Sequence, residues 1–149
     1  MKKLVLLALV PFMTVRAQAP SNPLTKATQR IDDSIRTNVL KAAEEMPEEN
    51  YSFKPVDTVR SFGQLVGHVA DAQYEFCSPV IGDGAKSPGV ENKTTKADLL
   101  EALKTAYAYC DKAYDGMTDA KGAEMAHFLG RSIPKLTLLS LNTAHTDEH

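Results

Sequence analysis

An excess of positive charge is missing from this sequence, and its absence limits the partners that the protein can bind. The 149 residues include 17 Lys+Arg against 19 Asp+Glu, with four histidines. Setting aside Lys2, Lys3 and Arg16, which belong to the first segment discussed below, leaves 14 Lys+Arg against 19 Asp+Glu, a net charge of −5. A chain with this balance and no basic stretch offers no electrostatic surface for a polyanion. We therefore expect no nucleic acid partner.

Long apolar runs are also missing, since the longest, Leu4 to Met13, has ten residues. A bilayer-spanning helix needs about 20 apolar residues, whereas a run of this length after two lysines is typical of a signal peptide. Val15-Arg16-Ala17 supplies the small residues of a cleavage site. We predict a signal peptide over 1–17 and an exported protein, periplasmic or secreted, with no membrane association after its removal.

Strand-type alternation is almost absent, and helical periodicity replaces it. Apolar residues first recur at spacings of three and four over 24–46, up to Pro47; the predicted inward stripe is Ala27, Ile31, Ile35, Val39, Ala42 and Met46. Ser61 and Gln64 fit a capping box for a second helix that runs to about Ile81. A third helix is predicted from Thr95 to Gly116 and a fourth from Pro134 onward, with surface loops over 82–94 and 117–132. Four amphipathic helices in 24–149 predict one all-α domain, a four-helix bundle.

There are only two cysteines, Cys77 and Cys110, too few for a disulfide scaffold. Each lies about 15 residues into its predicted helix. If the two helices run parallel, the cysteines are level and can form a disulfide. If they run antiparallel as neighbours, the cysteines are about 15 Å apart along the axis, at ~1.5 Å per residue, and cannot bridge. The thirteen-residue connection is long enough to return along a helix, so both arrangements stay open.

Half of the four histidines lie in the last five residues, His145-Thr146-Asp147-Glu148-His149. They continue the stripe of Leu138 and Leu141, so the spacing stays helical while the chemistry changes to imidazole. Residues four apart lie on one helix face, and a divalent metal would explain two imidazoles on an inward face. Two solvated histidines near a terminus are the alternative. A third ligand must be His68 or His127, and we prefer His68 because a helix positions a side chain more reproducibly than a loop.

Three segments together resemble the DinB-like family: Tyr51-Ser52-Phe53-Lys54-Pro55, the eleven residues from Ser61 to Asp71, and His145 to His149. The resemblance implies a four-helix bundle whose metal ligands are His68, His145 and His149. It also implies an activity like that of the family's thiol-dependent transferases, isomerases or proposed hydrolases. Members usually continue the last helix beyond its final histidine, so we expect this sequence to be truncated there.

Three imidazoles suit zinc or nickel and leave a coordination position open, as in catalytic sites. Candidate acid–base groups are Glu148 and Asp71, and Asp71, one turn after His68, is also placed to orient its ring. Solvated surface carboxylates are the alternative. Gly67 either leaves room for a close helix or ligand or occupies an undemanding position. We expect an enzyme acting on an unknown small molecule, with a non-catalytic metal- or partner-binding bundle as the alternative, and the sequence leaves a monomer and a homodimer both open.

Overall fold

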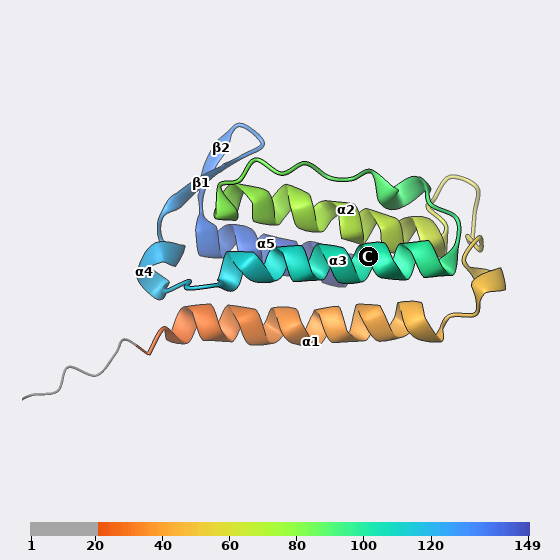
Figure 1. Ribbon diagram of the computed structural model, residues 1–149, viewed down its shortest axis with the longest axis horizontal. Helices are drawn as coiled ribbons and strands as arrows, with labels where there is room; N and C mark the ends of the chain where they lie inside the picture. Colours follow the sequence, from red (N-terminus) through yellow and green to blue (C-terminus); the bar gives the residue numbers. More distant parts are fainter. Residues whose placement is uncertain (1–20) are drawn as a thin grey trace, which may run out of the picture.

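The computed structural model describes residues 21–149, and the predicted signal peptide over 1–17 lies outside the described residues. The described part is an all-α bundle with one small hairpin (Figure 1). Its elements in order are α1 (Pro23–Glu45), η1 (Glu48–Asn50), α2 (Phe62–Ile81), η2 (Val90–Asn92), α3 (Lys96–Tyr114), α4 (Asp119–Gly122), β1 (Met125–Phe128), β2 (Arg131–Pro134) and α5 (Lys135–Glu148). The predicted fold class is confirmed, with α1, α2, α3 and α5 as the four long helices. Within residues 21–149, no helix combines the length and the apolar character needed to cross a membrane.

The helix starts follow from local chemistry. Ser61 accepts a hydrogen bond from the backbone N–H of Gln64, and the Gln64 side chain accepts one from the Ser61 N–H, so the predicted capping box is present. The Thr95 hydroxyl caps α3 in the same way by accepting from the Asp98 N–H at 3.2 Å. In α1 a proline occupies the first turn, where its missing N–H costs no intrahelical bond.

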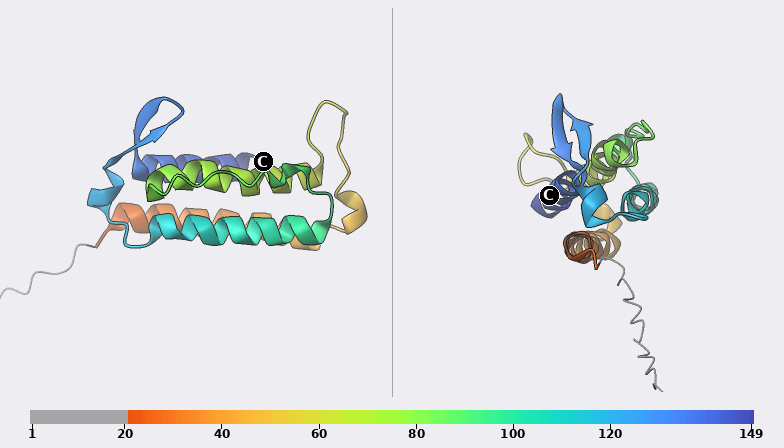
Figure 2. Two further views of the ribbon diagram at one scale, coloured as in Figure 1. Left: turned by 45° about the horizontal axis from the view of Figure 1, so that its top comes forward. Right: turned by 90° about the vertical axis from the view of Figure 1, so that its left-hand side faces the viewer.

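Figures 1 and 2 show that α2 and α3 run in the same direction, opposite to α1 and α5. The connection between α2 and α3, residues 82–95, makes this possible because it returns along α2 instead of turning directly into α3 (Figure 1). We call this connection the strap. Because the helices are parallel, Cys77 and Cys110 are level, and they form a disulfide with their Cα atoms 5.3 Å apart. The parallel alternative of the sequence analysis is therefore the right one.

The inward faces of α1 and α5 differ from the predicted stripes. Leu141 is 43% exposed, and α5 instead buries two leucines and three polar residues: Leu138, Leu139, Asn142, Thr143 and Thr146. In α1, Ile31 is 57% exposed whereas Asp32 is buried. The reason is that Asp32 has partners inside the bundle, namely the Arg36 guanidinium at 3.2 Å and the Thr143 hydroxyl at 2.9 Å. A paired carboxylate can take the inward position that the apolar pattern assigned to isoleucine.

The segment predicted as a surface loop over 117–132 contains regular structure. It holds the short helix α4 and strand β1, which pairs antiparallel with β2 in the register Met125↔Pro134 to Phe128↔Arg131. The hairpin projects from the end of the bundle where α5 begins (Figure 2). Each strand has four residues, too few for a clear alternating pattern. The hairpin leads the chain into α5 and so fixes where that helix starts.

Candidate metal centre

Two helices bring three histidines together. His68 lies in the second turn of α2, and His145 and His149 lie at the end of α5, which runs antiparallel to α2. One potential ligand atom from each ring lies within 4.8 Å of the others, and the ring centroids are 4.5 to 5.1 Å apart. His127, the other candidate third ligand, is exposed on β1 and is not part of this cluster. The structure thus brings together the three histidines that the sequence analysis selected.

The three rings differ in their surroundings. His145 is half-buried and packs against Phe76, with ring centroids 5.4 Å apart, while the His68 side chain is 22% exposed and His149 is exposed. Burial, followed by the nearby His149 and His68, lowers the pKa of His145 to about 4. Burial and the neighbouring His68 also lower the pKa of His149. At neutral pH both rings are therefore uncharged, and the neutral imidazole is the form that binds a metal.

One atom of the cluster lacks a partner inside the protein. The Nδ1 of His145 is buried and makes no hydrogen bond. Buried polar atoms nearly always have a partner, and leaving one unpaired costs free energy. Other buried atoms without a partner exist, among them Asn142 Oδ1, but only His145 belongs to a convergent group of potential ligands within the described residues. The donor set and this unsatisfied nitrogen fit a divalent cation.

A carboxylate that the sequence analysis missed faces the cluster from the strap. Glu91, in η2, places Oε2 at 3.4 Å from His68 Nδ1, while its Oε1 accepts a 2.7 Å hydrogen bond from Arg60 Nε. The strap reads as a polar surface loop with no helical periodicity, so nothing in its own sequence singles out this residue. The available signal was in α2, where a glycine directly precedes His68.

That glycine, Gly67, allows the strap to approach α2. A Cβ at this position would lie 2.6 Å from the Cα of Glu91 and 3.0 Å from the Val90 carbonyl oxygen. No real side chain tolerates the shorter distance without movement of the backbone. Gly67 does leave room, as one of the two interpretations held, but the room is taken by the strap and not by a packed helix or a ligand.

The two predicted acid–base residues have different positions. Asp71 holds the strap, because its carboxylate accepts hydrogen bonds from the Ser87 hydroxyl at 2.7 Å and from the backbone N–H groups of Val90 and Glu91, both at 3.0 Å. The carboxylate that faces the His68 ring is thus Glu91 and not Asp71. Glu148 is exposed on α5 next to His149, and its charge acts to raise the pKa of His145 against the larger effect of burial. A catalytic role for either residue stays a prediction.

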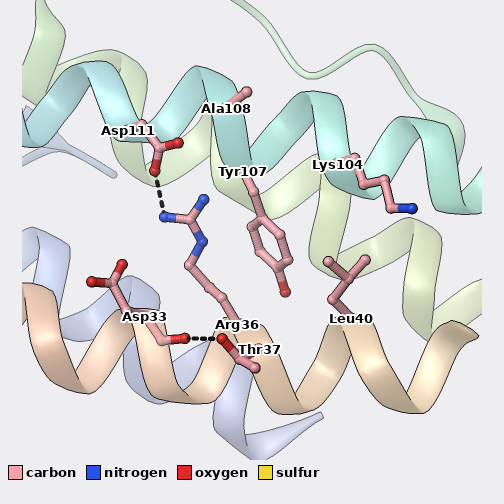
Figure 3. A pocket seen from close by; sticks show the side chains of 8 residues that line it. All are labelled: Asp33, Arg36, Thr37, Leu40, Lys104, Tyr107, Ala108 and Asp111. Carbon is pink, nitrogen blue, oxygen red and sulfur yellow. Dashed lines mark hydrogen bonds and ion pairs between the residues drawn. The ribbon is translucent and has the colours of Figure 1, made fainter.

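A different hollow, of about 420 Å³, lies between α1 and α3 (Figure 3). Its two cations, Arg36 and Lys104, already have protein partners. The Arg36 guanidinium donates to Asp111 at 2.7 Å and lies over the Tyr107 ring, and Lys104 pairs with Glu44 at 2.8 Å. Because both cations are neutralised by carboxylates of the same chain, this groove offers no unpaired cation to an anionic ligand.

Comparison with known proteins gives two findings. The family described as the DinB superfamily matches residues 32–149, which include all three clustered histidines and the strap. The uncharacterized protein YjoA of Bacillus subtilis (strain 168) is 28% identical over 121 residues, which cover 78% of this chain and 77% of the relative.

Proposed function

The chain belongs to the DinB superfamily, and we propose that it is an exported, metal-dependent enzyme acting on a small molecule at the His68, His145 and His149 cluster. The observation that carries the proposal is the convergence of three imidazoles from two helices, one of them with a buried nitrogen that has no protein partner. Export rests on the signal-peptide pattern of residues 1–17. N-terminal sequencing of the protein from its host tests it, and a mature chain that starts at Met1 contradicts it.

The chemistry follows from the donor set. Three neutral nitrogen ligands suit zinc or nickel and leave a position for water or substrate, whereas structural sites have all positions filled by protein. Bound there, such an ion lowers the pKa of a water or a substrate thiol, or polarises a carbonyl. The protein contributes by keeping His145 uncharged through burial and by holding the rings on two packed helices. These properties support a thiol-dependent transferase or a hydrolase.

A proton acceptor near the open position completes this proposal. Glu148 is our candidate, since it lies on α5 between His145 and His149 in sequence and its side chain is exposed and free to reach a bound substrate. Asp71 acts less directly, because its carboxylate accepts three hydrogen bonds from the strap.

The alternative is a bundle that binds a metal or a partner without catalysis. The exposure of His149 favours it, because a cluster open to solvent on one side does not exclude water from a bound substrate. The two functions differ in whether a substrate-like ligand enters the open position. We expect a simple thiol to change the visible absorption spectrum of the Co²⁺-loaded protein if the site is catalytic. An unchanged spectrum at saturating thiol favours the non-catalytic alternative.

The metal site itself is tested with four single variants, His68→Ala, His145→Ala, His149→Ala and the control His127→Ala. Zinc and nickel affinities are measured at pH 7.5 by competition with a chromophoric chelator. We expect each of the first three variants to bind at least about tenfold more weakly, in line with the loss of one ligand, and the control to match the wild type. Unchanged affinity in His68→Ala would remove α2 from the site. Loss of metal only in His127→Ala would place the third ligand on the hairpin.

A further inference from the structure

We infer that Glu91 is a positioning residue for this centre: its carboxylate accepts the Nδ1 proton of His68 and thereby leaves Nε2 as the ligand atom. The inference rests on the proposed metal-binding function. The 3.4 Å between Glu91 Oε2 and His68 Nδ1 is the starting observation. Which imidazole nitrogen binds a metal is set by the hydrogen bond that the other nitrogen makes. With a carboxylate oxygen 3.4 Å from Nδ1, we take Nε2 to be the nitrogen that remains for the ion.

The backbone of Glu91 is fixed at this place by two residues of α2. Asp71 accepts hydrogen bonds from the N–H groups of Val90 and Glu91, and Gly67 removes the Cβ that would otherwise meet the Glu91 Cα at 2.6 Å. The residue that anchors the strap therefore lies one helical turn after His68, and the residue that admits the strap directly precedes it. An exposed carboxylate on a free loop would have none of these restraints.

The side chain of Glu91 is held as well. Arg60 Nε donates to Oε1 at 2.7 Å, which directs the other oxygen towards His68. The guanidinium also stabilises the ionised carboxylate. Glu91 does not join the ligand group itself, because within residues 21–149 only His68, His145 and His149 bring ligand atoms within 4.8 Å of one another. A carboxylate that accepts from a metal-bound imidazole fixes its tautomer and raises its basicity, and its loss typically weakens metal affinity 10- to 100-fold.

The first test compares Glu91→Ala, Glu91→Gln and the control Glu101→Gln, which removes the same charge from an exposed position on α3. Zinc is the probe, and its affinity is measured by chelator competition at pH 7.5. We expect Glu91→Ala to bind zinc about 10- to 100-fold more weakly. Glu91→Gln should lose less, because its amide oxygen still accepts the Nδ1 proton without a charge. Glu101→Gln should stay within twofold of the wild type, and Glu91→Ala within twofold would overturn the inference.

The second test needs no metal and separates the inference from the proposed function. Nitrogen-15 NMR of the imidazole rings in metal-free protein at pH 8 should show His68 with its proton on Nδ1 in the wild type and in Glu91→Gln, and a shift of that proton towards Nε2 in Glu91→Ala. An unchanged tautomer in Glu91→Ala overturns the inference. If the wild type shows the Nδ1 tautomer but binds neither zinc nor nickel, the proposed function fails while the Glu91–His68 contact stands. If Glu91→Ala alters the coordination number of bound Co²⁺, Glu91 is a ligand and not a positioning residue.

Discussion

Two groups of polar side chains lie side by side between α2 and α5, and they differ in the hydrogen bonds that their members make to one another. In the first, which we call the amide network, Gln73 donates to the Thr146 hydroxyl at 3.1 Å and accepts from Asn142 Nδ2 at 2.9 Å. Gln73 is fully buried and Asn142 is 1% exposed. In the second, the histidine cluster, the buried Nδ1 of His145 has no partner. The same pair of helices thus carries one polar group joined by hydrogen bonds between the helices, in which Asn142 Oδ1 alone lacks a partner, and a second group in which His145 Nδ1 lacks one.

We interpret the difference as separating polar residues that specify the fold from polar residues that we propose bind a metal. A buried hydrogen bond between side chains is satisfied at only one relative position of two helices, so the amide network fixes how α5 lies along α2. Gln73 lies five residues after His68, and Asn142 lies three residues before His145. The position that satisfies the amides is therefore the one that brings the histidines together. Substitutions in the amide network should therefore lower stability more than metal affinity. Substitutions in the histidine cluster should lower metal affinity more than stability.

The largest expected effect is on the amide-network side, at the disulfide. Cys77→Ala/Cys110→Ala removes a cross-link between residues 33 apart in sequence, which a chain-entropy treatment values at about 3 to 4 kcal/mol. It also removes both sulfur atoms near Asn142 Nδ2, at 3.8 and 3.5 Å. We expect a loss of this size in the free energy of unfolding, measured with urea on metal-free protein. Wild type kept in dithiothreitol should reproduce most of it.

The zinc affinity of Cys77→Ala/Cys110→Ala is then measured under conditions in which the variant stays folded. It tests whether the amide network positions α5 without the disulfide. Because Gln73, Asn142 and Thr146 remain, we expect the histidines to stay aligned and the affinity to change less than threefold. A tenfold loss would mean that the disulfide, and not the amide network, sets the position of α5.

Features signalled by neighbouring residues were predictable from the sequence. The capping box of α2 and the four long helices follow from spacing and residue type. The choice of His68 over His127 rested instead on its position in a helix and on the family resemblance. The burial of Asp32 was not predictable. Besides Arg36, the partner of its carboxylate inside the bundle is Thr143, which is 111 residues away in sequence. Periodicity alone assigned the inward face to isoleucine, and only the tertiary pairing explains why the carboxylate lies there.

The strap was missed for a related reason. Its length allowed a direct turn into α3 or a return along α2, so the parallel arrangement and the disulfide stayed undecided. Glu91 then carried no signal, since a glutamate in a polar connection is ordinarily solvated. Gly67 and Asp71 both contact the strap. Their roles can be recognised only once it is known which segment of the chain packs against α2.

A moderate effect is expected where the strap meets the histidine cluster. In Gly67→Ala the new Cβ would meet backbone atoms of Glu91 at 2.6 and 3.0 Å, so the strap must move. We expect a net loss of about 1 to 2 kcal/mol in unfolding free energy, since overpacking outweighs the ~1 kcal/mol that alanine gains over glycine in a helix. Zinc affinity should fall severalfold as Glu91 moves away from His68.

Gly63→Ala is the matched control, in the same helix and four residues earlier. Its Cβ would lie 3.1 Å from the Tyr51 carbonyl oxygen and 3.2 Å from a Leu99 methyl group, contacts that relax by a few tenths of an ångström. We expect a stability change within about 1 kcal/mol, because the helix preference for alanine offsets this crowding, and an unchanged zinc affinity. If Gly67→Ala behaves like Gly63→Ala in both measurements, the close approach of the strap does not matter for the centre.

The smallest expected effect is on the pH dependence of stability in the metal-free protein, and it isolates the histidine cluster. The pKa of His145 falls to about 4 in the folded protein, against about 6.5 in an unfolded chain. Between these values the unfolded state binds the proton and the folded state does not, so stability is lost as the pH falls from about 6.5 towards 4. The slope is a fraction of the ~1.4 kcal/mol per pH unit that one proton allows, because the imidazole is only half-buried.

In His145→Leu this part of the stability loss at acidic pH should disappear, whereas His127→Leu, on the exposed hairpin, should keep it. Urea unfolding in EDTA at pH 7, 6 and 5 measures the difference, and parallel profiles for wild type and His145→Leu would show that folding does not lower the pKa of His145.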